Sequence, residues 1–369
     1  MGEGKSPVEG VGAGMKDFSF YQNKRVLVTG HTGFKGAWLC QILSDLGAKV
    51  TGYALPPPTS PSLYSLLGLD SKISSVIGDI RDYPHLKAVF DAAQPEIVFH
   101  LAAQPLVRRG YQEPVYTYEV NVMGTVHLLE CVRQSGCVRS FINVTTDKVY
   151  ENKEWVWGYR ETDRLNGSDP YSNSKSCSEL VTDAYVSSFF QGRHIALSTV
   201  RAGNVIGGGD FARDRIIPDC VRAAMKGEPV LLRNPHSVRP YQHVLEPLFV
   251  YLELAQRQYE NPAIAGRYNV GPAEEDCVTT AELAGLFCKH WGEGMSWQTA
   301  EDSGPREANF LKLDCSRLRS VLGWKPRWNI EQAVANTVEW AKVFARGGDV
   351  AHCTAQQIQE YLAGGGETE

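Results

Sequence analysis

The feature that most constrains this chain is a regular alternation of short apolar runs and helix-like segments in its first half. Apolar runs rich in β-branched residues predict buried strands at 25–30, 48–55, 73–80, 96–103, 140–146 and 195–205. Two intervening segments, 36–47 and 118–136, carry apolar residues at helical spacing. This alternation favours right-handed βαβ units, so we expect an α/β fold with a doubly wound parallel sheet.

The pattern changes after Gly203. Three consecutive glycines, 207–209, interrupt the chain, and the strands that follow are short and scattered. We expect a smaller mixed α/β lobe there, which binds the substrate. The chain is free to cross between this lobe and the first domain more than once. The expected divisions are a disordered tail 1–17, a cofactor domain 18–203, a substrate lobe 204–361 and a flexible tail 362–369.

A glycine-rich turn joins the first predicted strand to the first predicted helix, in the sequence TGHTGFKGAW. Gly30, Gly33 and Gly36 allow a tight turn and bring backbone N–H groups close to a pyrophosphate at the positive end of the helix. This position predicts a Rossmann-type dinucleotide site rather than a simple glycine turn. The predicted cofactor contacts are Gly30, Thr32, Gly33, Phe34, Lys35, Gly36, Asp79, Ile80, Leu101, Ala102, Ala103, Tyr171 and Lys175.

The choice between NAD and NADP stays open from these residues. The second predicted strand runs into VTGYALPPPTSPSL, which has no acid for the adenosine ribose. No arginine for a 2′-phosphate is evident there, although Lys35 lies within reach of one. Asp79 and Ile80, after the third strand, lie where an adenine is expected.

Polar residues gather where the fifth strand ends, in TTDK, and a YxxxK pattern follows at Tyr171 and Lys175. Residues four apart share a helix face, so the Lys175 ammonium and a cationic nicotinamide are expected to lower the pKa of Tyr171. A phenol tuned in this way can take a proton from a sugar hydroxyl. The alternatives are a solvated helix face and an exposed Asp147–Lys148 pair in a loop.

Several stretches together resemble the extended short-chain dehydrogenase/reductase family of nucleotide-sugar enzymes, and its dehydratases in particular. They are VTGHTGFKGAWL, GYALPPPTSPSL, FHLAAQPLVR, TTDKVYENKEWVWGYRE, RAGNVIGGGD and RPYQHVLEPL. The resemblance runs from Arg25 to the segment Leu322 to Trp328. It implies a bound NAD and a redox-neutral dehydration of a nucleotide sugar, with CDP-glucose as the substrate.

The resemblance also implies roles for the polar strand end. Tyr171 would deprotonate the 4-hydroxyl, with Thr146 bonded to the 4-oxygen and Lys175 beside the pair. Asp147 would protonate the departing 6-hydroxyl. Related dehydratases carry a glutamate as the C5 base where this chain has Lys148, so Lys148 is either a neutral base or a charged stabiliser of the enolate.

A nucleotide diphosphate requires local cations in a chain whose formal net charge is −5. Family position favours Asn204 and Arg239 as diphosphate contacts and Tyr241 as a stacking partner, whereas His243 is interpreted as structural. The predicted substrate contacts are Gln104, Asn204, Arg233, Arg239, Tyr241 and Arg306.

Two other functions remain open. A nucleotide-sugar 4-epimerase needs the tyrosine and lysine but no elimination acid or base, so Asp147 and Lys148 speak against it. A non-catalytic nucleotide-binding protein would not need the four catalytic groups together. The net negative charge argues against nucleic-acid binding. No segment has the length and apolarity of a membrane span.

The nine cysteines show no metal-binding spacing, so we expect no metal site and reduced thiols in a cytoplasmic protein. The helices predicted around 118–136 and 175–190 carry more apolar residues than one sheet face would use. The family resemblance implies that such helices from two subunits form a four-helix bundle, so we expect a homodimer, and a tetramer stays open.

Overall fold

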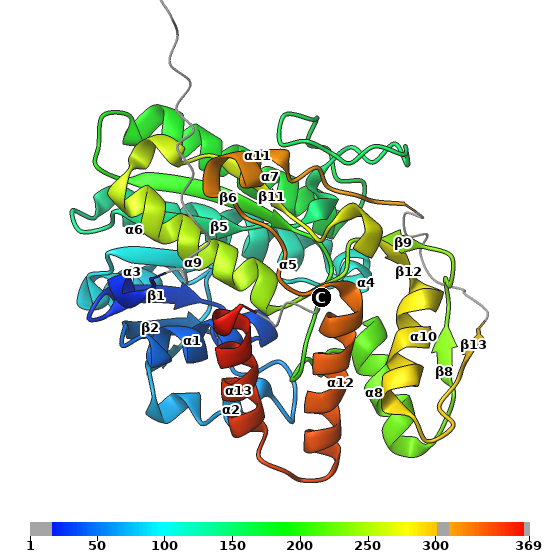
Figure 1. Cartoon of the computed structure of the whole chain (residues 1–369). Coiled ribbons are helices and arrows are strands. Elements are labelled where there is room, and N and C mark those ends of the chain that lie inside the picture. The colour runs from blue at the N-terminus through cyan, green and yellow to red at the C-terminus, as the bar shows by residue number, and fades with distance from the viewer. Residues whose placement is uncertain (1–16, 301–309, 365–369) are drawn as a thin grey trace, which may run out of the picture.

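Seven parallel strands form one sheet in the order β11-β6-β5-β4-β1-β2-β3 (Figure 1). This computed structural model describes residues 17–300 and 310–364. The strands are β1 (Arg25–Thr29), β2 (Lys49–Ala54), β3 (Ser74–Ile77), β4 (Ile97–His100), β5 (Ser140–Val144), β6 (Ala196–Ala202) and β11 (Arg267–Val270). The order reverses between β1 and β4, which is the arrangement of a doubly wound sheet and confirms the expected fold.

Helices cover both faces of this sheet because its strands are apolar on both sides. Val26 and Val28 of β1 belong to the core shared with α1 (Phe34–Asp45) and α9 (Leu245–Glu260). Leu27 points the other way, into the core shared with α3 (Tyr83–Ala93), α6 (Gly124–Gln134) and the end of the α7 region. Alternation of side chains along a strand produces these two cores.

Further helices, two of them long and the others short, surround the sheet. They are α2 (Leu63–Leu66), α4 (Val107–Gln112), α5 (Pro114–Tyr118), α7 (Pro170–Tyr185), α11 (Ser316–Leu322), α13 (Val350–Ala363) and the π-helical turns Glu119–Met123 and Val186–Phe190. The helical run predicted at 118–136 is therefore present, as a π-helical turn that continues into α6.

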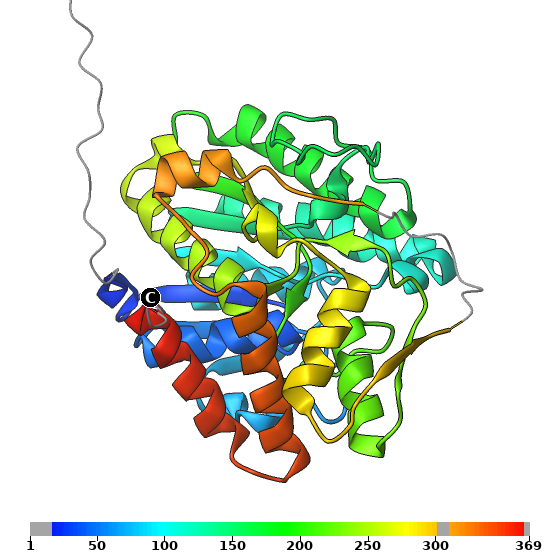
Figure 2. The same ribbon diagram turned by 45° about the vertical axis from the view of Figure 1, so that its right-hand side comes forward.

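A third core lies among α8 (Ile216–Lys226), α10 (Thr280–Trp291) and α12 (Ile330–Ala345), which stand beside the sheet (Figure 2). Three two-stranded sheets accompany them, namely β7 (Val205–Ile206) with β10 (Gln242–His243), β9 (Val238–Arg239) with β12 (Val278–Thr279), and β8 (Val230–Leu232) with β13 (Trp297–Thr299). The chain returns to the large sheet between these parts, because α9 and β11 fall within residues 204–361.

The ends of several predicted elements differ from the structure. Gly30 has a φ of +77°, so β1 ends one residue before it and the glycine starts the turn. Residues 101–103 and 145–146 also follow their strands as loops. At the other end of the chain, α13 continues to Ala363, so the first two residues of the predicted flexible tail are helical. Residues 1–16 and 365–369 of the two predicted tails lie outside the described residues.

The Glu246 carboxylate ties α9 to the last part of the chain. Its Oε1 accepts the backbone N–H groups of Arg327 and Trp328 at 2.9 and 2.8 Å, and its Oε2 accepts the Tyr361 hydroxyl at 2.9 Å. Glu246 is 1% exposed, and burial raises its pKa to about 7. Because the folded pKa lies above the ordinary 4.5, the stability that this group contributes is present below about pH 4.5 and is lost as the pH rises through about 7.

Glu246→Gln is therefore expected to stabilise the protein increasingly as the pH rises. A glutamine keeps an acceptor for the two backbone N–H groups and carries no charge at any pH. Its gain over the parent protein should grow between pH 5 and pH 8, by about 1–3 kcal/mol. Denaturant unfolding at both pH values would measure it, with the exposed Glu228→Gln as control. An equal difference at the two pH values would contradict the expectation.

Candidate active site

The glycine turn owes its shape to two of its three glycines. A Cβ on Gly30 would lie 2.7 Å from the backbone nitrogen of Ala102, and one on Gly36 would lie 2.2 Å from the carbonyl oxygen of Gly30. Gly33 differs, because a Cβ there would meet only the Gly30 oxygen, at 3.4 Å. The protein's own packing thus requires Gly30 and Gly36, whereas Gly33 leaves room beside the turn for another molecule.

The first turn of α1 is chemically prepared for an anion. Gly33 is its N-cap residue, no side chain caps the helix, and its first turn contains no acid. Unsatisfied N–H groups at such an end favour a negative group. Of the neighbouring predicted contacts, Thr32 donates its hydroxyl to the Leu55 carbonyl at 2.8 Å, and the Phe34 ring lies beside Gly207. The glycine turn, the uncapped start of α1 and these neighbouring residues together fit the pyrophosphate of a dinucleotide.

The region that would hold an adenosine contains a charge pair that the sequence analysis did not foresee. Asp79 accepts three hydrogen bonds from the Arg81 guanidinium, at 2.8 to 3.2 Å, and these hold the pKa of its carboxyl below the usual range. Arg81 also binds Glu119 at 2.8 Å and lies over the Tyr116 ring. Ile80 is buried. Asp79 and Ile80 remain predicted adenine contacts, and β2 ends without an acid, as the sequence indicates.

Asp147 lies at the centre of the polar strand end, and it is 1% exposed. Its Oδ1 accepts the Thr146 hydroxyl at 2.9 Å, whereas its Oδ2 is buried without a partner among the described residues. Burial raises the pKa of Asp147, and the charges of Lys148, Arg239 and Lys35 only partly oppose this. A carboxyl in this setting keeps its proton to higher pH and has one oxygen free to give that proton away.

Tyr171 and Lys175 lie one turn apart on α7, and both are buried. The Lys175 ammonium donates to the carbonyl of Val144, the last residue of β5, at 3.1 Å. Burial raises the pKa of Tyr171 to about 12, and a hydrogen bond with Thr146 and the charge of Arg215 oppose it. The expected lowering of this pKa is therefore not produced by the protein's own groups, because burial outweighs them.

Cations surround Asp147 and Tyr171. Burial, together with the positive charges of Arg215 and Lys175, lowers the pKa of Lys35 to about 7, while Asp147 acts in the opposite direction. Arg239 is 4% exposed and donates to the Val238 carbonyl at 2.9 Å. Arg215 precedes α8 and is held by Asp210 at 3.1 Å. Cations from α1, from β9 and from the residue before α8 thus act on the groups at the end of β5, an arrangement suited to binding a diphosphate there.

Comparison with known proteins identifies the family. The family model described as GDP-mannose 4,6 dehydratase matches residues 27–337. The chain belongs to this family. The CDP-glucose 4,6-dehydratase of Salmonella typhimurium is 49% identical over 355 residues, which cover 95% of this chain and 99% of that protein. The dTDP-glucose 4,6-dehydratase of Streptomyces antibioticus is 28% identical over 326 residues, 85% of this chain and 91% of that protein.

Solved structures share the fold of this family member. The UDP-glucose 4-epimerase of Thermotoga maritima with UDP-glucose has a TM-score of 0.75 at 23% identity, covering 86% of this chain and 99% of that one. The dTDP-glucose 4,6-dehydratase of Bacillus anthracis in complex with NAD has a TM-score of 0.73 at 21% identity, covering 89% and 98%. These values confirm the α/β architecture predicted from the sequence.

Some predicted substrate residues of this dehydratase-family chain have structural tasks. The Gln104 side chain is 2% exposed and bonds to Leu106 N and O in its own loop and to Thr117 Oγ1 on α5. The Tyr241 ring is buried in the core of the second lobe, with its hydroxyl 3.3 Å from Thr280. These contacts favour packing roles, and no observation tests the predicted substrate contacts of either residue.

The other predicted substrate residues differ in position. Asn204 follows β6, and its backbone oxygen accepts from Gln242 at 2.9 Å. Arg233 binds Asp214 at 3.1 Å and remains partly exposed. Arg306 lies outside the described residues. His243 is fully buried between Trp38 and Trp328, and burial lowers its pKa to about 3, in keeping with a structural histidine.

Two residues that the sequence analysis missed are Arg215 and His31. Arg215 is the last residue before α8. A cation directly before a helix was the signal in the sequence that could have identified it. His31 fills the space above Gly52, where a Cβ would lie 2.3 Å from the imidazole, and its Nε2 lies 2.8 Å from Ser75 Oγ. Burial lowers the pKa of His31 to about 4, so it is neutral.

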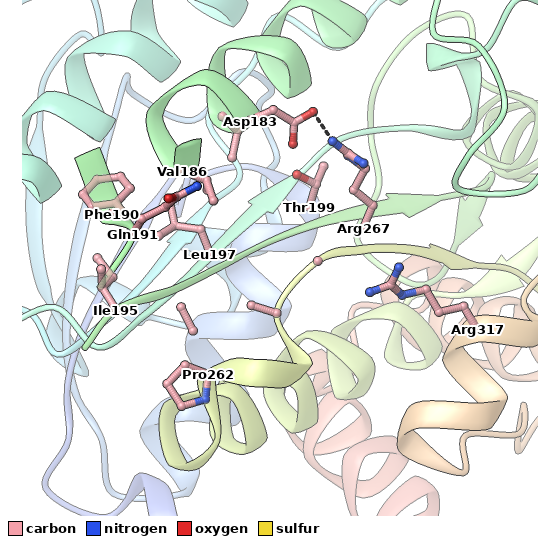
Figure 3. A pocket seen from close by; sticks show the side chains of 14 residues that line it. Asp183, Val186, Phe190, Gln191, Ile195, Leu197, Thr199, Pro262, Arg267 and Arg317 are labelled. Carbon is pink, nitrogen blue, oxygen red and sulfur yellow. Dashed lines mark hydrogen bonds and ion pairs between the residues drawn. The ribbon is translucent and has the colours of Figure 1, made fainter. Parts of the chain in front are cut away.

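A cavity of about 440 Å³ lies away from these groups, beside the amino-terminal ends of β6 and β11 (Figure 3). Its walls include Phe190, Leu197 and the ion pair between Asp183 and Arg267, whose atoms are 2.5 Å apart. None of the predicted site residues is among those that line it. In the part of the chain that the structure describes, no group of three acidic, histidine or cysteine side chains is placed to hold a metal, and no helix is long and apolar enough to cross a bilayer.

Proposed function

We propose that this chain converts CDP-D-glucose to CDP-4-dehydro-6-deoxy-D-glucose and water, with NAD as its cofactor. The observation that carries this proposal is the buried group of Thr146, Asp147, Tyr171 and Lys175 at the carboxyl ends of the strands. The 49% identity to a CDP-glucose 4,6-dehydratase over 95% of the chain supports the choice of reaction and nucleotide.

The cofactor fits the glycine turn, where Gly33 leaves room for a pyrophosphate and the start of α1 offers free N–H groups. Bound NAD would accept a hydride from C4 and return it to C6. The B. anthracis dehydratase structure contains NAD, which supports this choice over NADP. On this proposal Leu101, Ala102 and Ala103 border the nicotinamide side of the site, and Asp79 and Ile80 border the adenine side.

Tyr171 has the first chemical task, removal of the proton from the sugar 4-hydroxyl. Its pKa of about 12 means that the protein alone holds it as a neutral phenol. A further positive charge beside it is needed to favour the phenolate, as the cationic nicotinamide would provide. Thr146, which is hydrogen-bonded with Tyr171, would also bind the sugar 4-oxygen. Lys175 keeps its place through Val144 and adds positive charge to the site.

Asp147 and Lys148 carry the elimination. Oxidation at C4 acidifies the C5 proton, and we assign its removal to the side-chain amine of Lys148. The protonated carboxyl of Asp147 then gives its proton to the departing 6-hydroxyl, so that water leaves as the C5–C6 double bond forms. Its raised pKa and its unpaired Oδ2 suit this task.

The substrate's diphosphate is assigned to the cations of the second lobe. Two of these cations act electrostatically on the proposed reacting groups. The charge of Arg239 lowers the pKa of Asp147, and the charge of Arg215 lowers the pKa of Tyr171. Arginine suits a diphosphate because its planar fork donates in pairs. Asn204 joins them by its position after β6.

The product distinguishes this function from its alternatives. The purified protein is incubated with CDP-glucose and NAD, and the product is analysed by mass spectrometry and NMR. Loss of one water with a keto group at C4 is the expected result. An unchanged mass with inverted C4 would indicate a 4-epimerase, and unchanged CDP-glucose would indicate a binding protein; either outcome would refute the proposal.

The same proposal extends to assembly and compartment. Large apolar side chains remain exposed on the α6–α7 side, where a homodimer interface would cover them; they are Met123, Leu180, Val186 and Phe189. A homodimer, or a tetramer built from it, and a cytoplasmic location with reduced thiols complete the proposal. All nine cysteines are unpaired. The division into a cofactor domain 18–203 and a substrate lobe 204–361 is also retained as a proposal.

A further inference from the structure

A fully buried ion pair lies directly beneath the proposed reaction centre. Arg201 on β6 donates through Nε at 2.9 Å and through Nη2 at 2.5 Å to the carboxylate of Glu179 on α7, and both side chains are 0% exposed. Burying two charges is unfavourable unless their geometry is close to ideal, and such pairs are poor evidence for a stabilising role alone. The groups that this pair holds point to a different task.

Helix α7 holds the end of β5 at two consecutive residues. The Lys175 ammonium donates to the Val144 carbonyl at 3.1 Å, and the Thr145 hydroxyl donates to Glu179 Oε1 at 2.6 Å. Lys175 and Glu179 are one helical turn apart, so one face of the helix grips the strand at both points. The next residues along the chain are Thr146, Asp147 and Lys148.

Arg201 also reaches the far end of the segment that carries those residues. Its Nη1 donates to the Tyr150 hydroxyl at 2.6 Å and to the Glu161 carbonyl at 3.1 Å. The Tyr150 hydroxyl in turn donates a hydrogen bond to Asn269 Oδ1 of β11 at 2.6 Å. Through Glu179 and through its own Nη1, the single guanidinium therefore fixes both ends of the segment 145–161.

We propose that Glu179, oriented by Arg201, is a positioning residue for the dehydration. It holds Thr146, Asp147 and Lys148 in register with Tyr171, and its charge keeps Lys175 an ammonium at working pH. The kinetic part of this inference rests on the proposed function. Neither residue touches the substrate, so both act through the groups that they hold.

The electrostatic part follows from the surroundings of Lys175. Burial lowers the pKa of Lys175 to about 8, and the negative charge of Glu179 acts in the opposite direction. The other titratable groups around it are Lys35 from α1, His100 from β4, Asp147 after β5, Tyr171 from α7 and Arg201 from β6. Burial lowers the pKa of His100 to about 3, so it is neutral, and Arg201 is the partner of Glu179 in the ion pair.

Glu179→Gln tests this charge. Without the carboxylate, Lys175 loses its proton at lower pH, so the alkaline limb of the kcat profile is expected to move down by about one pH unit. At neutral pH kcat should fall about tenfold, with KM for CDP-glucose nearly unchanged. Amide hydrogen exchange across residues 145–161 should become faster. An alkaline limb that stays in place would overturn the electrostatic part.

Thr145→Val is the second variant, because it removes one hydrogen bond and leaves the ion pair intact. It should lower kcat severalfold and speed exchange in 145–150, with the alkaline limb unmoved. It also decides the question if Glu179→Gln fails to fold, as judged by circular dichroism. Parental kcat and parental exchange in Thr145→Val would overturn the positioning role.

Glu253→Gln is the matched control. Glu253 is a buried glutamate that pairs with Arg257 at 2.8 Å on α9, on the other face of the sheet. It should lower stability without moving the pH profile, and an equal shift in this control would overturn the inference. A parent protein that forms no product from CDP-glucose would refute the proposed function and the kinetic part, while hydrogen exchange would still test the positioning contacts.

Discussion

Asp147→Asn is expected to stop the loss of water while oxidation at C4 continues. The buried carboxyl has a raised pKa and one unpaired oxygen, so it is the group best placed to protonate the departing 6-hydroxyl. An asparagine keeps the size and accepts the Thr146 hydrogen bond, but it has no acidic proton to give. Loss of a general acid lowers the rate by about 10²–10⁴-fold.

A single-turnover experiment separates the two steps. The quenched reaction is reduced with borodeuteride, so that a 4-ketone formed without water loss appears as deuterium at C4 of CDP-hexose. The variant should accumulate this species, whereas the parent protein should yield the 6-deoxy product. Asp163→Asn is the matched control, because Asp163 lies just after the segment 145–161 and pairs with Arg160 near the surface. Normal dehydration by Asp147→Asn would remove Asp147 from the role of acid.

The pH dependence of the parent protein should agree with this assignment. A raised folded pKa means that the protonated carboxyl persists above the ordinary value of 3.8 and is lost as the pH rises through the higher value. Dehydration, but not C4 oxidation, should therefore decline on the alkaline side for this reason. The residual dehydration rate of Asp147→Asn should lack the alkaline decline that loss of the Asp147 proton causes in the parent protein.

The sequence predicted those parts of the site that are encoded locally. The turn containing Gly30, Gly33 and Gly36 lies between a strand and a helix, and its glycines are readable from spacing alone. Tyr171 and Lys175 are one helical turn apart, so their shared face also follows from spacing. The sheet follows from the alternation of apolar runs with helices.

What the sequence did not reveal depends on contacts between distant segments. The ion pair of Glu179 with Arg201 joins a helix to a strand 22 residues away, and no spacing pattern links the two residues. Arg215 acts on Lys35 across the two lobes. The sequence also did not reveal how deeply Tyr171 is buried. Its raised pKa depends on how completely the surrounding segments exclude water from its phenol.

Lys148→Ala is expected to abolish both exchange at C5 and dehydration, with slow oxidation at C4 retained. Lys148 directly follows Asp147, is partly buried and acts electrostatically on it, which places its amine beside the group that protonates the 6-hydroxyl. Removing a general base costs about 10²–10⁴-fold in rate. The measurement is incorporation of solvent deuterium at C5, read by NMR, together with product formation. Lys153→Ala, an exposed lysine of the same segment, is the control.

Lys148→Arg then separates the two roles that the chemistry allows. A guanidinium keeps the positive charge but cannot become a neutral base at working pH. If Lys148 is the base, the arginine variant should be as inactive in C5 exchange as the alanine variant. If it instead stabilises the enolate by its charge, Lys148→Arg should retain much of the exchange that Lys148→Ala has lost, and the base would then be sought elsewhere. Exchange and dehydration near the parental rate in Lys148→Ala would exclude both roles.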